Sequence, residues 1–291
     1  MFKGAMTALV TPFKDGNIDE ATLRMLIERQ IEGGIDGLVP CGTTGESATL
    51  THEEHRRVIE ITVETAGGRV PVIAGTGSNS TTESVILTKF AKEAGADAAL
   101  LITPYYNKPS QEGLYQHYKT VAESVEIPIM LYNVPGRTAV NMSPETTARL
   151  SKIETIFGIK EATGDLKQVE ETIRLAQEGF ILLSGDDEST LPILSIGGSG
   201  AISVTSNLVP ADVANMYAAF NEERLQEAQE IHERLLPLSS AMFIETNPVP
   251  VKTALAMMEL IGEALRLPLV EMGKENKEIL KKALEDYGLL K

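Results

Sequence analysis

The sequence has few of the residues that mark secreted, membrane or nucleic-acid-binding proteins. Among its 291 residues there is no tryptophan and only one cysteine, Cys41, so the chain cannot form an internal disulfide. There are 26 Lys and Arg residues against 41 Asp and Glu residues, which gives a formal net charge of −15. This excess of negative charge argues against binding to nucleic acid or to anionic membranes. A single cysteine is typical of proteins from a reducing compartment.

Long hydrophobic runs are also missing. The amino-terminal segment, MFKGAMTALVTPFKDG, has only a short apolar stretch interrupted by Thr7 and Thr11, which is too weak for a signal peptide. No apolar stretch approaches the roughly 20 residues that a membrane-spanning helix needs. We therefore expect a cytoplasmic protein, and the 43% of hydrophobic residues are enough for one large core.

Eight short apolar runs rich in β-forming residues predict strands. They span residues 5–11, 37–42, 70–75, 97–103, 127–133, 155–161, 180–185 and 200–205. Between them, apolar residues at three- and four-residue spacing predict helices, for example over 20–34, 52–68 and 82–96. Thr51 and Glu54 form a capping-box pattern, and Gly33, Gly67 and Gly95 stand where these helices should end.

The spacing of these runs predicts the fold. Successive strands begin 20–33 residues apart, which is the length of one βα unit. Eight such units favour an α/β fold of the (β/α)₈ TIM-barrel type over an open doubly wound sheet. After Pro210 only helices are expected, over 211–235, 250–264 and 272–288, with proline residues such as Pro237 interrupting them. We therefore expect a barrel over 1–223 and a helical extension over 224–291.

Two residues at the predicted carboxyl ends of neighbouring strands suggest covalent chemistry. Lys160 ends the apolar run TIFGIKE, and strand alternation places it on one face with Gly158 and Ile156. If that face points into the barrel, desolvation favours the neutral amine, which is a nucleophile toward a carbonyl carbon. Tyr132 ends the preceding strand, so its phenol could relay protons to and from that amine. Taken alone, Lys160 is as well explained by an exposed strand end, and Tyr132 by an ordinary core position.

Two loops on the same side of the predicted barrel could bind carboxylates. The segment CGTTGES (41–47) combines glycines, which allow close backbone approach, with the hydroxyls of Thr43 and Thr44. Capping of the next helix would explain the same pattern. Arg137, in YNVPGRT (132–138), could clamp a carboxylate through two parallel hydrogen bonds, or form a surface ion pair.

Taken together, these motifs resemble a known family. GTTGE (42–46), PYYNKP (104–109), YNVPGRT (132–138), GIKEATGD (158–165) and LSGDD (183–187) closely resemble the 4-hydroxy-tetrahydrodipicolinate synthases, also called dihydrodipicolinate synthases. The resemblance runs from TALVTPF (7–13) to ETNPVPVK (245–252). It implies a Schiff-base-forming lyase of the class I aldolase type that condenses pyruvate with L-aspartate 4-semialdehyde on the route to diaminopimelate and lysine.

The resemblance also implies roles for individual residues. Lys160 would form the imine with pyruvate, and Tyr132, Thr43 and Tyr106 would relay protons, with Tyr106 reaching across from a neighbouring subunit. Thr43 and Thr44 would hold the pyruvate carboxylate, and Arg137 the carboxylate of the semialdehyde. Gly185 and the carbonyl of Ile202 would line the pocket. No metal or organic cofactor is expected, and the assembly would be a homotetramer built from two tight dimers.

A regulatory site is a further implication of the resemblance. Feedback-inhibited members bind L-lysine at the tight dimer interface, through positions that here are Ser47, Ala48, His52, His55, Asn79, Glu83 and Tyr105. Ser80 stands where many regulated members have alanine. Most of the set is present, so we expect inhibition by L-lysine.

Three other functions are weighed against this one. A metal-dependent aldolase would need a ligand cluster, but of the four histidines only His52 and His55 are close in sequence. Other Schiff-base pyruvate aldolases, such as N-acetylneuraminate lyase or 2-keto-3-deoxy-sugar-acid aldolases, share the lysine and tyrosine but usually differ in GTTGE, in PYYN and at the position of Arg137. The third alternative is a non-catalytic barrel that binds a keto acid.

Overall fold

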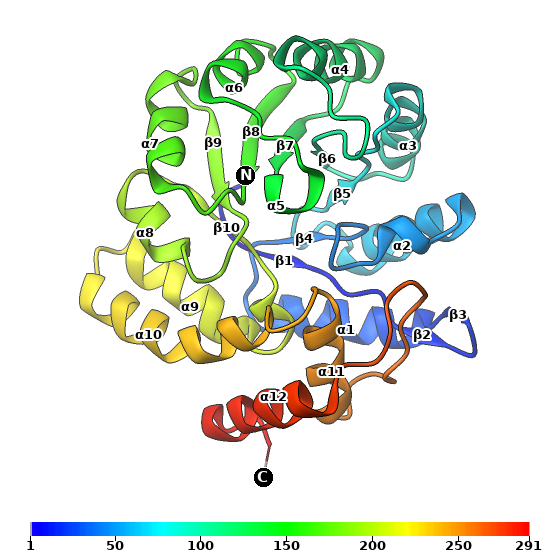
Figure 1. Cartoon of the computed structure of the whole chain (residues 1–291), viewed down its shortest axis with the longest axis vertical. Coiled ribbons are helices and arrows are strands. Elements are labelled where there is room, and N and C mark those ends of the chain that lie inside the picture. Colours follow the sequence, from blue (N-terminus) through cyan, green and yellow to red (C-terminus); the bar gives the residue numbers. More distant parts are fainter. Residues whose placement is uncertain (1, 291) are drawn as a thin grey trace.

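Eight parallel strands form the centre of the structure. The computed structural model describes residues 2–290 (Figure 1). The barrel strands are β1 (Gly4–Ala8), β4 (Gly37–Val39), β5 (Ile73–Gly75), β6 (Ala98–Ile102), β7 (Ile129–Asn133), β8 (Ile156–Glu161), β9 (Ile181–Ser184) and β10 (Gly200–Ser203). The sheet runs in the order β4-β1-β10-β9-β8-β7-β6-β5, and a bridge between Leu38 and Val72 joins its two ends. The predicted TIM barrel is therefore confirmed, with strands shorter than the predicted runs.

Helices follow the barrel strands, and all but the single turn α5 (Pro135–Thr138) lie outside them around the barrel (Figure 1). They are α1 (Glu20–Glu32), α2 (His52–Ala66), α3 (Thr81–Glu93), α4 (Gln111–Ser124), α5 (Pro135–Thr138), α6 (Pro144–Leu150), α7 (Leu166–Leu175), α8 (Thr190–Ser195) and α9 (Pro210–Asn221). The capping box at Thr51 is present, and Gly33 and Gly67 are the C-caps of α1 and α2. A hairpin of β2 (Phe13–Lys14) and β3 (Asn17–Ile18), which the sequence pattern did not predict, precedes α1.

One irregularity in β8 changes which side chains face the barrel interior. Ile129 pairs with Ile156, but the next residue, Met130, pairs with Gly158, so Phe157 is an extra residue in β8. An extra residue reverses the alternation of the strand before it. Ile156 therefore packs in the outer layer between strands and helices, while Phe157 packs against the interior cluster. The prediction that Ile156 shares the face of Lys160 was wrong.

The carboxyl-terminal part differs in detail from the expectation. Its helices are α10 (Leu225–Ala241), α11 (Val249–Met257) and α12 (Lys274–Tyr287). The single helix predicted over 211–235 is two helices, because the chain turns at Glu223, whose φ of 61° is left-handed. Pro237 lies inside α10 rather than interrupting it. The helix predicted over 250–264 ends early, shortly before Glu259 with its φ of 58°.

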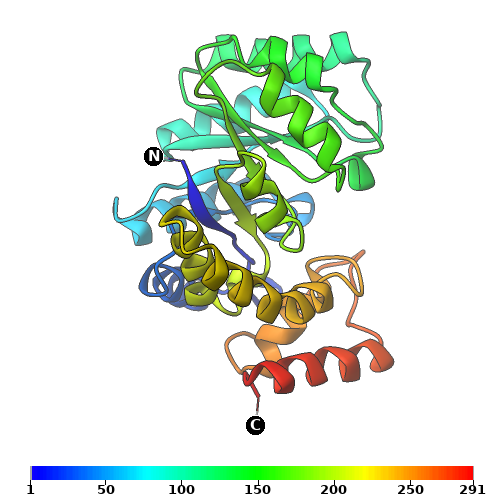
Figure 2. The ribbon, with the colours of Figure 1, turned by 90° about the vertical axis from the view of Figure 1, so that its left-hand side faces the viewer.

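The extension packs against one side of the barrel, next to α1 and α9, as two views at right angles show (Figures 1 and 2). Its buried side chains form one cluster with barrel residues, including Val10 and Leu26 from the amino-terminal part and Leu238 and Leu284 from α10 and α12. The division at residue 223 stays a prediction, because the two parts share this core. No helix within residues 2–290 is long and apolar enough to cross a membrane.

Removing a buried side chain of α12 should destabilise barrel and extension together. Leu284 is fully buried in the shared cluster, so Leu284→Ala should lower the free energy of unfolding by about 2–5 kcal/mol in one cooperative transition. Ile279 on the same helix is 55% exposed, and Ile279→Ala should cost less than about 1 kcal/mol. Denaturant unfolding followed by circular dichroism measures both. A separate early transition for the extension would contradict the shared core.

Candidate active site

Lys160 and Tyr132 lie side by side at the carboxyl ends of β8 and β7. They are paired in the strand register, and the Lys160 Nζ lies 4.4 Å from the centre of the Tyr132 ring. Each side chain is only 6% exposed, so Lys160 is not an exposed strand end. Within residues 2–290, no carboxylate forms an ion pair with the Lys160 amine. A buried amine without a counter-ion is the arrangement that favours reaction with a carbonyl group.

Gly185 provides room for the lysine side chain. It follows β9, and its amide donates a hydrogen bond of 2.7 Å to the carbonyl of Glu161. A Cβ atom at this position would lie 3.0 Å from Lys160 Cε and 2.8 Å from the Ala162 Cβ. The structure therefore places Gly185 against Lys160 and leaves no space there for a larger residue. Ile202 is buried in β10, in the interior cluster that also contains Tyr132.

The 41–47 segment forms a compact turn after β4. The carbonyl of Gly42 accepts from the Gly45 amide at 3.1 Å, and the carbonyl of Thr43 accepts from the Glu46 amide at 3.1 Å. In the described part of the chain the amides of Thr43 and Thr44 have no hydrogen-bond partner. Two free amides in a tight turn form a positively polarised concavity for an anion.

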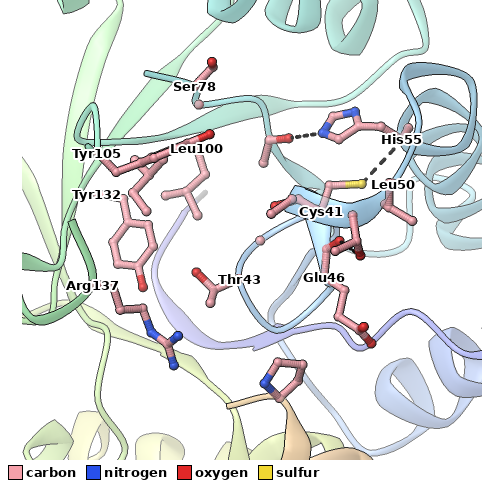
Figure 3. Close-up of a pocket in the computed structure, with 18 of the residues that line it drawn as sticks. Cys41, Thr43, Glu46, Leu50, His55, Ser78, Leu100, Tyr105, Tyr132 and Arg137 are labelled. Atoms are coloured by element: carbon pink, nitrogen blue, oxygen red, sulfur yellow. Dashed lines mark hydrogen bonds between the residues drawn. The ribbon is translucent and has the colours of Figure 1, made fainter. Parts of the chain in front are cut away.

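The two threonine hydroxyls point to different places. Thr43 lines the cavity, on the side opposite Tyr132 (Figure 3). Thr44 is buried, and its Oγ1 accepts a hydrogen bond of 3.0 Å from Asn247 Nδ2. Of the two hydroxyl-bearing residues, only Thr43 therefore lines the cavity.

Arg137 lies on the single-turn helix α5 rather than on an irregular loop. Its Nη2 donates to the carbonyl of Asn247 at 3.2 Å. No carboxylate within residues 2–290 pairs with it, so the alternative of a surface ion pair does not hold for the described chain. The guanidinium lines the cavity with most of its hydrogen-bonding capacity unused (Figure 3).

A cavity of about 480 Å³ connects these groups. Thr43, Tyr132 and Arg137 line it, whereas Lys160, Thr44, Gly185 and Ile202 are not among its lining residues. Thr246, Asn247 and Pro248 complete one wall. Sequence reasoning missed Asn247, although the motif NPVPVK, just before the predicted helix at 250, marked this segment.

The expected lysine site opens into the same cavity. Six of its seven residues line the cavity, and they are Ser47, Ala48, His52, His55, Glu83 and Tyr105. Asn79 does not, and its carbonyl accepts from Asn107 Nδ2.

The two histidines of that set have different environments. His52 is exposed and its Nε2 lies 2.9 Å from Glu83 Oε1. His55 is buried, and its Nε2 lies 2.9 Å from the carbonyl of Gly75. Burial lowers the pKa of His55 to about 4, so its ring is neutral near pH 7.

Tyr106 is the one predicted relay residue that this chain does not bring to Lys160. Its side chain is 89% exposed, and its φ of 71° is left-handed. A bulky residue held in that conformation signals local strain. Its neighbour Tyr105 lines the cavity instead.

The acidic segment 186–188 lies between β9 and α8. Asp187 is half-buried, and its Oδ2 accepts hydrogen bonds from the amides of Val204 at 2.9 Å and Thr205 at 3.0 Å. It therefore joins the end of β9 to the end of β10. Within residues 2–290, no group of three or more His, Cys, Asp or Glu side chains is placed to hold a metal ion.

The fold, with a buried lysine and tyrosine at the carboxyl ends of adjacent strands, is that of a lyase of the class I aldolase family. Residues 1–287 match the model of the dihydrodipicolinate synthetase family. The chain belongs to this family.

Relatives and solved structures agree over the full length. The chain is 61% identical to the 4-hydroxy-tetrahydrodipicolinate synthase of Syntrophus aciditrophicus and 58% identical to that of Thermodesulfovibrio yellowstonii, covering 100% of each protein in both cases. A solved dihydrodipicolinate synthase from Acinetobacter baumannii, complexed with pyruvate, is 46% identical with a TM-score of 0.97 and full coverage of both chains. A lysine-bound DHDPS from Cyanidioschyzon merolae is 39% identical with a TM-score of 0.96, over 99% of both chains.

Glu161, which follows Lys160, makes stability depend on pH. Its buried carboxylate accepts hydrogen bonds from Asn133 Nδ2 and from the Thr163 amide, yet burial raises the pKa of Glu161 from 4.5 to about 7. Between these values the folded chain binds more protons than the unfolded chain, so this group makes stability fall as pH rises. The loss should total about 3 kcal/mol.

Glu161→Gln should remove that dependence. Urea unfolding between about pH 5 and about pH 8 should show wild type losing stability relative to the variant as pH rises. Glu170→Gln, on the exposed face of α7, is the matched control and should follow wild type. A constant difference between wild type and Glu161→Gln across the range would contradict the raised pKa.

Proposed function

We propose that this chain condenses pyruvate with L-aspartate 4-semialdehyde through a Schiff base on Lys160, as a 4-hydroxy-tetrahydrodipicolinate synthase in diaminopimelate and lysine biosynthesis. The observation that carries the proposal is the buried Lys160 amine, without a carboxylate partner and 4.4 Å from the ring of Tyr132. The names of the relatives and the pyruvate-bound neighbour support the choice of substrates.

The first half of the reaction requires an imine. The neutral Lys160 amine attacks the ketone carbon of pyruvate, and the resulting carbinolamine loses water. Tyr132 and Thr43 relay the protons that this step moves, with Tyr106 of a neighbouring subunit as the third member. The free amides of Thr43 and Thr44 hold the pyruvate carboxylate.

The second half forms the carbon–carbon bond. The iminium acts as an electron sink, so the pyruvate methyl group loses a proton and an enamine forms. The enamine attacks the aldehyde carbon while Arg137 binds the carboxylate of the semialdehyde. The amino group of that substrate then displaces Lys160 and closes the ring. Every step uses side chains and substrates alone, so we propose that no metal or organic cofactor takes part.

Location and assembly remain proposals as well. We propose a cytoplasmic homotetramer made of two tight dimers. The exposed side chain of Tyr106, which forms no hydrogen bond within residues 2–290, supports a contact with a neighbouring subunit. Other Schiff-base pyruvate aldolases would share Lys160 and Tyr132. The guanidinium of Arg137, which has no carboxylate partner within residues 2–290, and the 41–47 turn favour two carboxylate-bearing substrates over pyruvate with a sugar aldehyde, which has no carboxylate.

Trapping the imine tests this function. Wild-type protein incubated with pyruvate and borohydride should gain one reduced pyruvate adduct, which intact mass and peptide mapping should place on Lys160. Lys160→Met should gain none, while Lys252→Met, at the other buried lysine, should still be labelled. In a separate assay without borohydride, pyruvate and L-aspartate 4-semialdehyde should be turned over by wild type and by Lys252→Met but not by Lys160→Met. A folded wild type without an adduct would leave the keto-acid-binding barrel as the better explanation.

Tyr106→Phe tests the shared active site. Loss of the hydroxyl should lower kcat by about 10²-fold or more, as expected for removal of a proton relay. The melting temperature should stay close to that of wild type, because Phe keeps the aromatic ring and loses only the hydroxyl. Tyr115→Phe, on α4, serves as the control with wild-type turnover. Wild-type kcat in Tyr106→Phe would refute the relay role.

Inhibition by L-lysine tests the regulatory residues. The carboxylate of Glu83, next to His52, is placed to accept a charged amine. L-lysine at millimolar or lower concentration should therefore reduce turnover, and Glu83→Gln should raise the half-inhibitory concentration about tenfold. An unchanged rate at saturating L-lysine would remove the proposed site.

A further inference from the structure

A second buried lysine lies beneath the active-site turn. Lys252 on α11 is 1% exposed, and its Nζ lies 2.5 Å from Glu46 Oε1 and 2.9 Å from the carbonyl of Thr11. The same Nζ lies 4.3 Å from the centre of the Phe13 ring. Burial lowers the pKa of Lys252, and the nearby Glu46 carboxylate opposes that effect. Unlike Lys160, this lysine has a carboxylate partner.

Glu46 is part of the turn that carries Thr43 and Thr44. Its φ of 53° is left-handed, and its amide donates to the Thr43 carbonyl to close the turn. The second oxygen of its buried carboxylate, Oε2, accepts from the Arg266 amide at 3.1 Å. Both carboxylate oxygens are thus bound by residues of the carboxyl-terminal extension, more than 200 positions away in sequence.

The same extension also contacts the other substrate-binding groups. Asn247, which precedes α11, donates to the Thr44 hydroxyl and accepts from Arg137. The segment 247–252 therefore contacts both ends of the 43–46 turn and the guanidinium across the cavity. Figure 3 shows Thr43 between Tyr132 and Glu46.

A buried ion pair contributes little net free energy to the stability of the fold. Desolvation of both ions offsets most of their attraction, and apolar residues of similar volume are often equally stabilising. An ion pair with additional backbone hydrogen bonds does, however, fix the relative position of two segments.

We propose that the Glu46–Lys252 pair is a positioning element that sets the geometry of the Thr43–Thr44 turn, and hence pyruvate binding, from the carboxyl-terminal extension. This inference rests on the proposed function. Glu46 and Lys252 touch neither substrate, so they are positioning residues rather than catalytic ones.

The test compares single variants with the double variant. Glu46→Gln and Lys252→Met each leave one buried charge unpaired and should lower the melting temperature. Glu46→Gln/Lys252→Met removes both charges and should recover most of that loss. Its KM for pyruvate should nevertheless rise about tenfold or more, because a displacement of about 1 Å in a substrate-binding group has effects of this size. Its KM for the semialdehyde should change less than its KM for pyruvate, because Glu46 and Lys252 bind the 43–46 turn directly, whereas Arg137 is bound by Asn247.

If the double variant fails to fold, Glu46→Asp tests the same positioning role. Glu46→Asp retains both charges but shortens the tether, so it should also raise the pyruvate KM about tenfold. The matched control breaks another ion pair of the extension, Lys277 with Glu263, which is partly exposed and 2.5 Å long. Lys277→Met should leave the pyruvate KM unchanged.

The outcomes separate this proposal from the proposed function. If wild type shows neither an adduct nor turnover, the proposed function itself fails. If wild type is active and the folded Glu46 variants keep the wild-type pyruvate KM, only the positioning role is overturned. If the double variant regains its melting temperature but keeps a raised pyruvate KM, the positioning role is supported. A pair that served stability alone would regain the wild-type melting temperature and the wild-type pyruvate KM together.

Discussion

The structure depends on one constraint, which is that the Lys160 amine must stay out of water and away from carboxylates. An amine in such a place is costly unless it is neutral or finds a counter-charge. The barrel provides the place, because parallel strands bring Tyr132 and Lys160 together at one end, and Gly185 gives the side chain room. The chain has 41 acidic residues, yet within residues 2–290 none pairs with Lys160 or Arg137. The Lys160 amine and the Arg137 guanidinium therefore have no carboxylate partner in the described chain that a substrate would need to displace.

The two buried lysines, Lys160 and Lys252, differ in whether a carboxylate neutralises the amine. Both are almost inaccessible to solvent and both lie near an aromatic ring, Lys160 at Tyr132 and Lys252 at Phe13. Only Lys252 has a carboxylate within ion-pair distance, at Glu46. A charged, hydrogen-bonded ammonium stabilises a local arrangement, whereas an unpaired amine keeps its lone pair available when it is neutral. The two residues thus support function in different ways, one by chemistry and the other by position.

The sequence predicted the barrel, because the barrel depends on local patterns, whereas most of the proposed site residues followed from the family resemblance. Apolar runs at βα spacing identified the eight strands, and the capping box at Thr51 marked the start of α2. The sequence analysis also weighed an inward position for Lys160. It wrongly placed Ile156 on the same face as Lys160, because the apolar pattern of the strand does not reveal the extra residue, Phe157. The break at Glu223 was missed because a left-handed glutamate has no sequence signal comparable to glycine. Asn247 and Lys252 were missed as contacts of the active-site turn because they meet it only through tertiary packing.

The most direct test of the central claim is an NMR measurement of which lysine nitrogen bonds to pyruvate. Protein enriched with [ε-15N]lysine and mixed with [2-13C]pyruvate should show a one-bond 13C–15N coupling for a single lysine. The account predicts that this coupling is absent in Lys160→Met and intact in Lys252→Met. A coupling that survives in Lys160→Met, or no coupling in folded wild type, would contradict the claim that the buried, unpaired amine of Lys160 is the reactive group.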